Sequence, residues 1–130
     1  MAGPLILVVE DNPRNLKLAR DVLCYAGYRT LEACNAEDGI RLANQHSPDL
    51  ILMDVQLPGM DGDAALEILR ESPGTRDIPV VALTAFAMKD DRDRLLATGF
   101  DGYLVKPISV PDFADQVGEF VTLRATELGR

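Results

Sequence analysis

Residues 50–62 have the sequence LILMDVQLPGMDG, in which a short apolar run ends in a carboxylate and a chain-breaking segment follows. The run Leu50–Met53 has the length and composition of a buried strand. Asp54 comes directly after it, and Pro58–Gly62 interrupts the chain before the next helical pattern. We therefore predict a strand that delivers an acidic side chain into a loop, where binding and catalytic residues are often found.

Four further runs share this character: Leu5–Val9, Tyr28–Ala33, Val80–Leu83 and Gly102–Val105. Between the runs lie segments with apolar residues at helical spacing. Runs that are apolar almost without interruption indicate strands covered on both faces, and alternating strands and helices indicate a parallel sheet with right-handed crossovers. We therefore predict a doubly wound α/β domain with helices on both faces of a five-stranded sheet.

The chain has 130 residues, which is enough for one domain. We place this domain at residues 1–124 and a C-terminal tail at residues 125–130, because the apolar pattern fades after about Phe120. We expect no second domain within this sequence. The only cysteines, Cys24 and Cys34, suggest neither a disulfide framework nor a zinc site, and we expect ordinary buried or half-buried thiols.

The net charge and the length of the apolar runs argue against nucleic-acid binding and against insertion into a membrane. A formal charge of −8 would repel a nucleic-acid backbone, so direct DNA binding is disfavoured. The longest wholly apolar run, Leu5–Val9, is far shorter than the ~20 residues that cross a bilayer, and no basic and apolar leader precedes it. We expect a cytoplasmic protein without a membrane partner.

Reactive side chains follow four of the five predicted strands. Open parallel sheets bind ligands beyond the carboxyl ends of their strands, and the residues expected there are Glu10, Asp11, Asp54, Thr84 and Lys106. Two carboxylates about 4 Å apart repel by ~4 kcal/mol at an effective dielectric of 20, and one lysine cannot neutralise three of them. Unless one carboxyl stays protonated, a divalent cation is the natural counterion, and oxygen ligands favour Mg²⁺ over zinc. Such a site suits an acyl phosphate, with one carboxylate attacking phosphorus.

Four motifs in this order resemble the receiver domain of two-component response regulators: Val9-Glu10-Asp11-Asn12, Asp54 with Leu57-Pro58-Gly59-Met60-Asp61-Gly62, Leu83-Thr84-Ala85, and Lys106-Pro107. The resemblance covers essentially the whole chain. It implies a flavodoxin-like fold with strand order 2-1-3-4-5. Within the family, residues 84–89 and 106–110 look most like the single-domain regulators of the DivK type, which act in cell-cycle control, and like receivers attached to hybrid kinases.

The resemblance also implies the chemistry of the site. Asp54 would accept a phosphoryl group from a histidine kinase or a histidine phosphotransfer protein. The ligands of Mg²⁺ would be Glu10, Asp11, Asp54 and the backbone carbonyl of Gln56. The family often has aspartate at position 10, so whether Glu10 contacts the ion directly or through water stays open.

The phosphoryl oxygens would be bound by Lys106, by the Thr84 hydroxyl and by the Ala85 amide. The resemblance also implies a cis peptide before Pro107, a rare bond in general. Phosphorylation would draw Thr84 inward and open space for Tyr103, which biases the surface of the fourth helix, fifth strand and fifth helix toward a partner-binding form. The residues expected on this surface are Phe86, Met88, Tyr103, Leu104 and Phe113. We expect a signalling switch that docks on sensor kinases, as a monomer or weak dimer, and not an enzyme with a separate substrate.

Phe86 leads to a kinetic prediction. Gln56 and Phe86 lie two residues beyond Asp54 and Thr84, at positions that in this family face the water that attacks the acyl phosphate. A large apolar side chain at Phe86 would screen that water, so we expect a long-lived phosphoprotein. The substitution Phe86→Ala should accelerate dephosphorylation, measured as the decay of the phosphorylated mass; an unchanged rate would contradict the prediction.

Two other classes compete with this interpretation. A magnesium-dependent phosphohydrolase of the haloacid-dehalogenase type also uses an aspartate after a parallel strand, but the DxDx[TV] pattern is absent, since Val55 and Gln56 follow Asp54. A receiver that serves as an interaction scaffold without phosphorylation usually lacks some of the pocket residues, and here none is lost. Dinucleotide and P-loop motifs are absent from the sequence.

Overall fold

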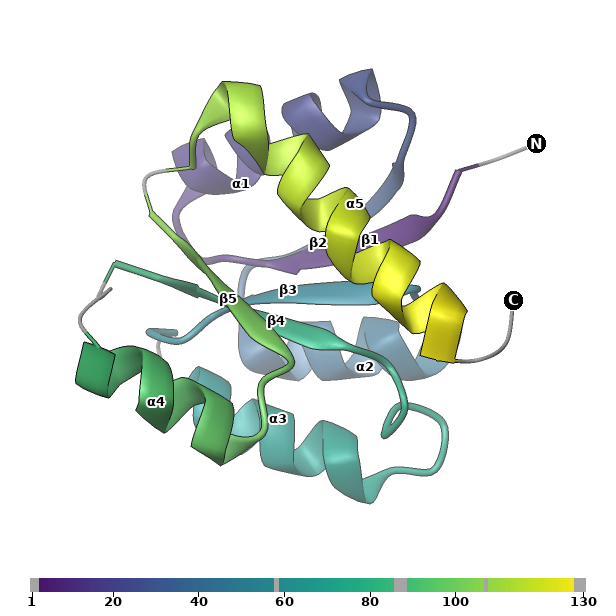
Figure 1. Cartoon of the computed structure of the whole chain (residues 1–130). Coiled ribbons are helices and arrows are strands. Elements are labelled where there is room, and N and C mark those ends of the chain that lie inside the picture. Colours follow the sequence, from purple (N-terminus) through teal and green to yellow (C-terminus); the bar gives the residue numbers. More distant parts are fainter. Residues whose placement is uncertain (1–2, 58, 86–88, 107, 128–130) are drawn as a thin grey trace.

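The computed structural model describes residues 3–57, 59–85, 89–106 and 108–127, and strands and helices alternate along them (Figure 1). The strands are β1 (Leu5–Val9), β2 (Arg29–Ala33), β3 (Leu50–Asp54), β4 (Val80–Thr84) and β5 (Gly102–Val105). The helices are α1 (Pro13–Tyr25), α2 (Ala36–His46), α3 (Gly62–Glu71), α4 (Lys89–Thr98) and α5 (Val110–Glu127). All neighbouring strands pair in parallel in the order β2-β1-β3-β4-β5, so the predicted fold and strand order are confirmed.

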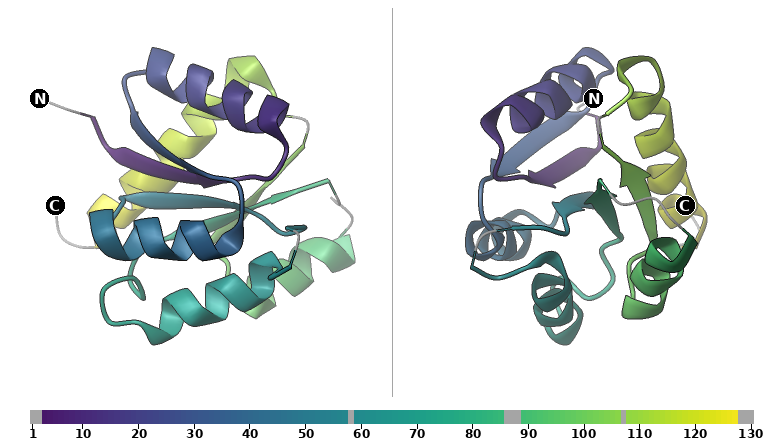
Figure 2. Two further views of the ribbon diagram at one scale, coloured as in Figure 1. Left: turned by 180° about the vertical axis from the view of Figure 1, so that it is seen from behind. Right: turned by 90° about the vertical axis from the view of Figure 1, so that its left-hand side faces the viewer.

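Two apolar layers sandwich the sheet. Helices α1 and α5 cover one face, and α2, α3 and α4 cover the other (Figure 2). Side chains alternate between the layers along each strand, so Ile6 and Val8 pack toward α1 and α5 whereas Leu7 and Val9 pack on the opposite side. Burial of each large aliphatic side chain contributes about 1.5–3 kcal/mol, which makes β1, β3 and β4 the stable centre of the domain.

Three helices begin at polar N-cap residues close to the carboxyl ends of the strands. The Asn12 side chain accepts hydrogen bonds from the backbone of Arg14 and Asn15 at the start of α1, where Pro13 occupies the first helical position. Asn35 caps α2 and Asp61 caps α3 in the same way. These caps turn the chain back sharply, so the loops that follow β1, β2 and β3 gather at one edge of the sheet.

Several predicted boundaries needed correction. Strand β2 begins at Arg29 and not at Tyr28, and β3 and β4 include Asp54 and Thr84, because these residues still pair with the neighbouring strand. Helix α5 continues to Glu127, past residue 124 where we expected the tail to begin.

The expectation for the two cysteines was wrong, since both thiols are exposed. Cys24 is next to the inward-facing Leu23 on α1, and one residue of helix rotates a side chain by about 100° away from the core. No helix in the described ranges is long and apolar enough to span a bilayer.

Arg70 near the end of α3 connects the loop before β4 with the loop before β5. Its guanidinium donates to the carbonyl oxygens of Arg76 at 3.0 Å, Ile78 at 2.7 Å and Gly99 at 3.3 Å, and it pairs with Asp101 at 2.7 Å. The same Asp101 oxygen accepts a hydrogen bond from the Val80 amide at 2.8 Å. This network therefore fixes the entry of β4 and β5 into the sheet.

We expect Arg70→Met to lower the free energy of unfolding by about 2 kcal/mol, because it leaves three carbonyls and a carboxylate without their charged donor. Urea unfolding measures the loss. Arg41→Met is the matched control, since Arg41 is exposed and its ion pair with Asp38 and its hydrogen bond to Gln45 are both long, at 3.4 Å. Equal effects in the two variants would contradict the proposed role of the network.

Candidate functional site

The sheet brings the predicted acidic residues to one edge. Val9 pairs with Met53, so the residues that follow them, Glu10 and Asp54, lie on adjacent strands at the same level. One carboxylate oxygen from each of Glu10, Asp11 and Asp54 lies within 4.8 Å of the other two. Glu10 and Asp54 are buried, with 1% and 3% exposure, whereas Asp11 is open to solvent. We call these three residues the acidic cluster.

Lys106, which follows β5, forms an ion pair with the Asp54 carboxylate. Its ammonium lies 2.8 Å from Asp54 Oδ2 and 3.2 Å from Glu10 Oε2. The Gln56 amide donates to the other oxygen, Asp54 Oδ1, at 2.9 Å. Both oxygens of Asp54 therefore have a defined donor, and the orientation of the carboxylate is fixed before any ligand arrives.

Two asparagine contacts to Glu10 were missed by the sequence analysis. The Asn12 amide lies 3.3 Å from Glu10 Oε1, and the Asn15 side chain lies 3.4 Å from the same oxygen. The position of Asn15 in the first turn of the helix that follows the acidic pair was the available signal. These donors help to explain how a glutamate is accommodated in a buried position.

The acidic cluster perturbs the ionisation of its members. Burial raises the pKa of Glu10 above its ordinary value, and the negative charge of Asp54 raises it further, while Lys106 acts in the opposite direction. Burial alone would lower the pKa of Lys106, but the hydrogen bond to Asp54 and the charges of Asp54 and Glu10 raise it overall. Lys106 is therefore firmly cationic, and ionised Glu10 is electrostatically strained.

The hydroxyl-bearing side of the site comes from β4. Thr84 is buried at 2% exposure, and its carbonyl accepts a hydrogen bond from the Lys106 amide at 2.7 Å. The next residue, Ala85, is exposed, as is Gln56. The structure thus places Thr84 and Lys106 on paired strand ends beside the acidic cluster; the predicted Phe86, Met88 and Pro107 lie outside the described residues.

The acidic cluster is suited to a hard divalent cation. Its donor atoms are all oxygens, two of its members are held in place by the protein, and Asp11 opens toward solvent. Mg²⁺ favours carboxylate oxygens and keeps several of its waters, which requires such an open side. Glu10, Asp11 and Asp54 are therefore the residues that could hold the ion.

Of the described residues predicted for the switch surface, two are buried in the structure. Tyr103 is half-buried, and the Arg92 guanidinium of α4 lies 5.5 Å from its ring centroid, a cation–π contact that the sequence analysis missed. Leu104 and Phe113, however, are buried at 7% and 1% exposure. Leu104 points to the opposite face from Tyr103 because side chains alternate along β5, and it packs with Phe113 beneath α5. The expectation that Leu104 and Phe113 are surface residues was therefore wrong, because both belong to the core.

A doubly wound sheet with a buried carboxylate, two further carboxylates and a lysine at its carboxyl edge is the arrangement of a receiver domain. Residues 6–117 match the family model for the response regulator receiver domain, and the chain belongs to this family. It is 43% identical over 116 residues to the polar-differentiation response regulator DivK of Brucella anthropi, covering 89% of this chain and 94% of that protein. The corresponding DivK of Brucella ovis is 42% identical with the same coverage.

Solved structures of receivers superpose closely on the fold. The receiver domain of the sensor histidine kinase PA1611 from Pseudomonas aeruginosa has a TM-score of 0.84 and 35% identity over 93% of this chain and 99% of that one, and it carries a magnesium ion in its active-site cleft. A response regulator from Chloroflexus aurantiacus has a TM-score of 0.85 and 27% identity, covering 92% of this chain and 98% of that one. The predicted family and the similarity to DivK are therefore confirmed.

Proposed function

We propose that this protein is a phosphorylation-dependent switch in which Asp54 accepts a phosphoryl group from a phosphohistidine of a kinase or a phosphotransfer protein. The observation that carries the proposal is the Asp54 carboxylate, buried, oriented by Lys106 and the Gln56 amide, and adjacent to two further carboxylates. A residue with only a structural role would not require this concentration of negative charge in a buried place.

In the proposed transfer an Asp54 oxygen forms a bond to phosphorus as the phosphorus–nitrogen bond of the donor histidine breaks. The electron pair of that bond returns to the donor imidazole. Mg²⁺ bound by Glu10, Asp11, Asp54 and the Gln56 carbonyl would supply positive charge for the phosphoryl oxygens. Lys106 lies close enough to Asp54 to pair with the incoming group, and the Thr84 hydroxyl at the end of β4 and the Ala85 amide would bind its oxygens.

The output of the switch is a change in protein binding. A phosphoryl group on Asp54 would add charge and acceptor oxygens beside Thr84, the last residue of β4. Tyr103 on the adjacent β5, capped by Arg92, is the aromatic side chain placed to respond. We propose that Tyr103 belongs to the readout surface of α4, β5 and α5, that Phe86 and Met88, which precede α4 in the sequence, contribute to it, and that its occupants include sensor kinases.

The proposed biological role follows the relatives. Polar-differentiation regulators of the DivK name are similar to this chain over nearly their whole length. We propose a comparable role here, in a cytoplasmic phosphorelay that controls the cell cycle or cell polarity.

Intact mass after incubation with acetyl phosphate tests the proposed function. The wild-type protein should gain one phosphoryl group with Mg²⁺ and none after chelation, and Asp54→Asn should gain none. Asp77→Asn, an exposed aspartate on the loop before β4, is the matched control and should behave as wild type. The absence of any gain from acetyl phosphate and from a phosphorylated histidine phosphotransfer protein would favour the scaffold alternative.

A further inference from the structure

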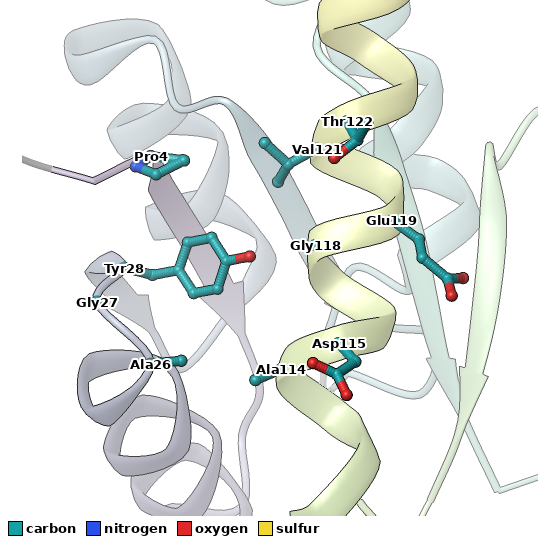
Figure 3. Close-up of a pocket in the computed structure, with 10 residues that line it drawn as sticks. All are labelled: Pro4, Ala26, Gly27, Tyr28, Ala114, Asp115, Gly118, Glu119, Val121 and Thr122. Carbon is teal, nitrogen blue, oxygen red and sulfur yellow. The ribbon is translucent and has the colours of Figure 1, made fainter.

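A hollow of about 1030 Å³ lies between the end of α1 and the middle of α5 (Figure 3). One wall includes Pro4, which precedes β1, and Tyr28, which precedes β2, so the hollow is at the amino ends of these strands. Glu10 follows β1 at the other end, and five residues of strand span roughly 17 Å. The hollow is therefore separate from the acidic cluster.

Tyr28 and Gly118 shape the hollow. The Tyr28 ring points across to α5, where a side-chain carbon at Gly118 would lie 2.9 Å from the tyrosine oxygen (Figure 3). Glycine inside a helix is about 1 kcal/mol less favourable than alanine, and here its missing side chain gives the ring room to reach α5. Within the described ranges no group hydrogen-bonds to the Tyr28 hydroxyl. Pro4, Ala26 and Val121 add apolar side chains to the same lining.

The α5 side of the hollow carries negative charge that no described residue of the chain neutralises. Asp115 lies at its edge, and Glu119 projects one turn further along α5 (Figure 3). Both side chains are exposed, and neither forms an ion pair with a described residue. Like charges four residues apart on a helix repel each other. Asp21 on α1, by contrast, already pairs with Lys17 at 2.6 Å.

The lining narrows the choice of occupant. None of its described residues is lysine, arginine or histidine, so the hollow favours a cationic ligand. A second copy related by two-fold symmetry would bring Asp115 and Glu119 against themselves, which disfavours a dimer. Residues Ala114 to Thr122 of α5 extend over about 13 Å, the length of two to three turns of a helix laid alongside.

We propose that this hollow is a docking site for a basic amphipathic helix of a partner protein. The helix inserts an apolar side chain beside Tyr28 and Val121, donates a hydrogen bond to or accepts one from the Tyr28 hydroxyl, and places lysine or arginine near Asp115 and Glu119. Because Asp54 lies at the opposite end of the strands, docking here is independent of phosphorylation. The site would therefore tether the switch to a partner in both of its states.

An NMR titration of the ¹⁵N-labelled full chain at physiological salt tests the proposal. The probe is a synthetic helical peptide with a leucine stripe flanked by lysines. We expect shift changes centred on Ala26–Tyr28 and on residues 114–122, with the same affinity for wild type and Asp54→Asn. The double variant Asp115→Asn, Glu119→Gln should weaken binding about five- to tenfold, as expected for two surface charge contacts. Ala26→Gln, at an exposed position between the helices, should obstruct the hollow without a change in charge.

The matched control removes an equally spaced pair from α3, Glu67→Gln with Glu71→Gln, and should change the affinity less than twofold. Shift changes spread over other acidic surfaces, or equal weakening by this control, would overturn the proposal in favour of unspecific attraction. Concentration-dependent shifts at residues 114–122 without peptide would make a second copy the occupant. Peptide binding seen only after removal of residues 1–2 or 128–130 would make a chain end the occupant, and no binding at all would likewise overturn the proposal.

Discussion

Replacing Lys106 with methionine is expected to lower the free energy of unfolding of the metal-free protein by about 2–4 kcal/mol. Lys106 is the cation that touches both Asp54 and Glu10, at 2.8 and 3.2 Å, and its side chain is only 18% exposed. Removing one partner of a buried ion pair leaves an uncompensated charge, which typically costs 3–5 kcal/mol. The open side of the site at Asp11 lets water reduce this penalty.

Urea unfolding in a chelator measures the loss, and repetition with Mg²⁺ tests its cause. The divalent ion should stabilise the Lys106→Met variant more than the wild type, because it then supplies the only positive charge among the carboxylates. Lys17→Met is the matched control. Its 2.6 Å pair with Asp21 is shorter, but its side chain is 67% exposed, so we expect a loss below about 1 kcal/mol. Similar losses in both variants would show that burial does not set the strength of the Lys106 contacts.

The opposite sign is expected for Glu10→Gln, which should raise the stability of the metal-free protein at neutral pH by about 1–2 kcal/mol. Carboxylates separated by 4–5 Å repel by roughly 3–4 kcal/mol at an effective dielectric of 20, and Lys106 offsets part of this. Glutamine keeps the shape of the side chain and removes its charge. The function of the site is thus expected to oppose the stability of the fold.

The pH dependence follows from the raised pKa of Glu10. In the folded protein this carboxyl holds its proton at pH values where the unfolded chain, with the ordinary value of 4.5, has lost it. Stability contributed by the protonated form is therefore present at low pH and is lost as pH rises through the raised pKa. The advantage of Glu10→Gln should be full above that pKa and should shrink as pH falls toward 4.5.

Thermal or urea unfolding between pH 4.5 and 8 measures this window in a chelator. Glu71→Gln, at an exposed position on α3, should show no such pH-dependent gain. The Glu10→Gln variant should also gain less stability from Mg²⁺ than the wild type does, since it has one carboxylate fewer. A loss of stability at neutral pH would mean that the contacts of Glu10 with Lys106 and the two asparagines outweigh its repulsion by Asp54.

Together the two variants separate the attractive and repulsive halves of one site. Lys106 and the acidic residues come from strand ends as far apart in sequence as positions 10 and 106, yet their effects on stability are coupled through direct contact. The double variant should therefore depart from the sum of the two single changes. Methionine at position 106 removes an attraction that glutamine at position 10 has already weakened.

The amino-acid sequence was sufficient for the fold class and for the acidic site. Uninterrupted apolar runs such as Leu50–Met53 report burial on both faces of a strand, and this is a local property that needs no knowledge of neighbours. Parallel strands share one carboxyl edge, so residues that follow them must converge wherever the sheet is parallel. From this rule alone, Glu10, Asp54 and Lys106 are expected to lie close together.

The tertiary structure decides which apolar residues are buried and which side chains from different elements meet, and the local sequence pattern does not encode either. The sequence alone does not show whether an apolar residue such as Leu104 lies in the core or on a binding surface. Leu104 is a core residue because β5 pairs with β4 and α5 covers the face toward which its side chain points. The contact of Arg92 with Tyr103 and the placement of Asp115 and Glu119 beside the hollow depend on how helices lie against other elements. Helix orientation is set by the sum of many packing contacts across the chain, so no segment read in isolation contains it.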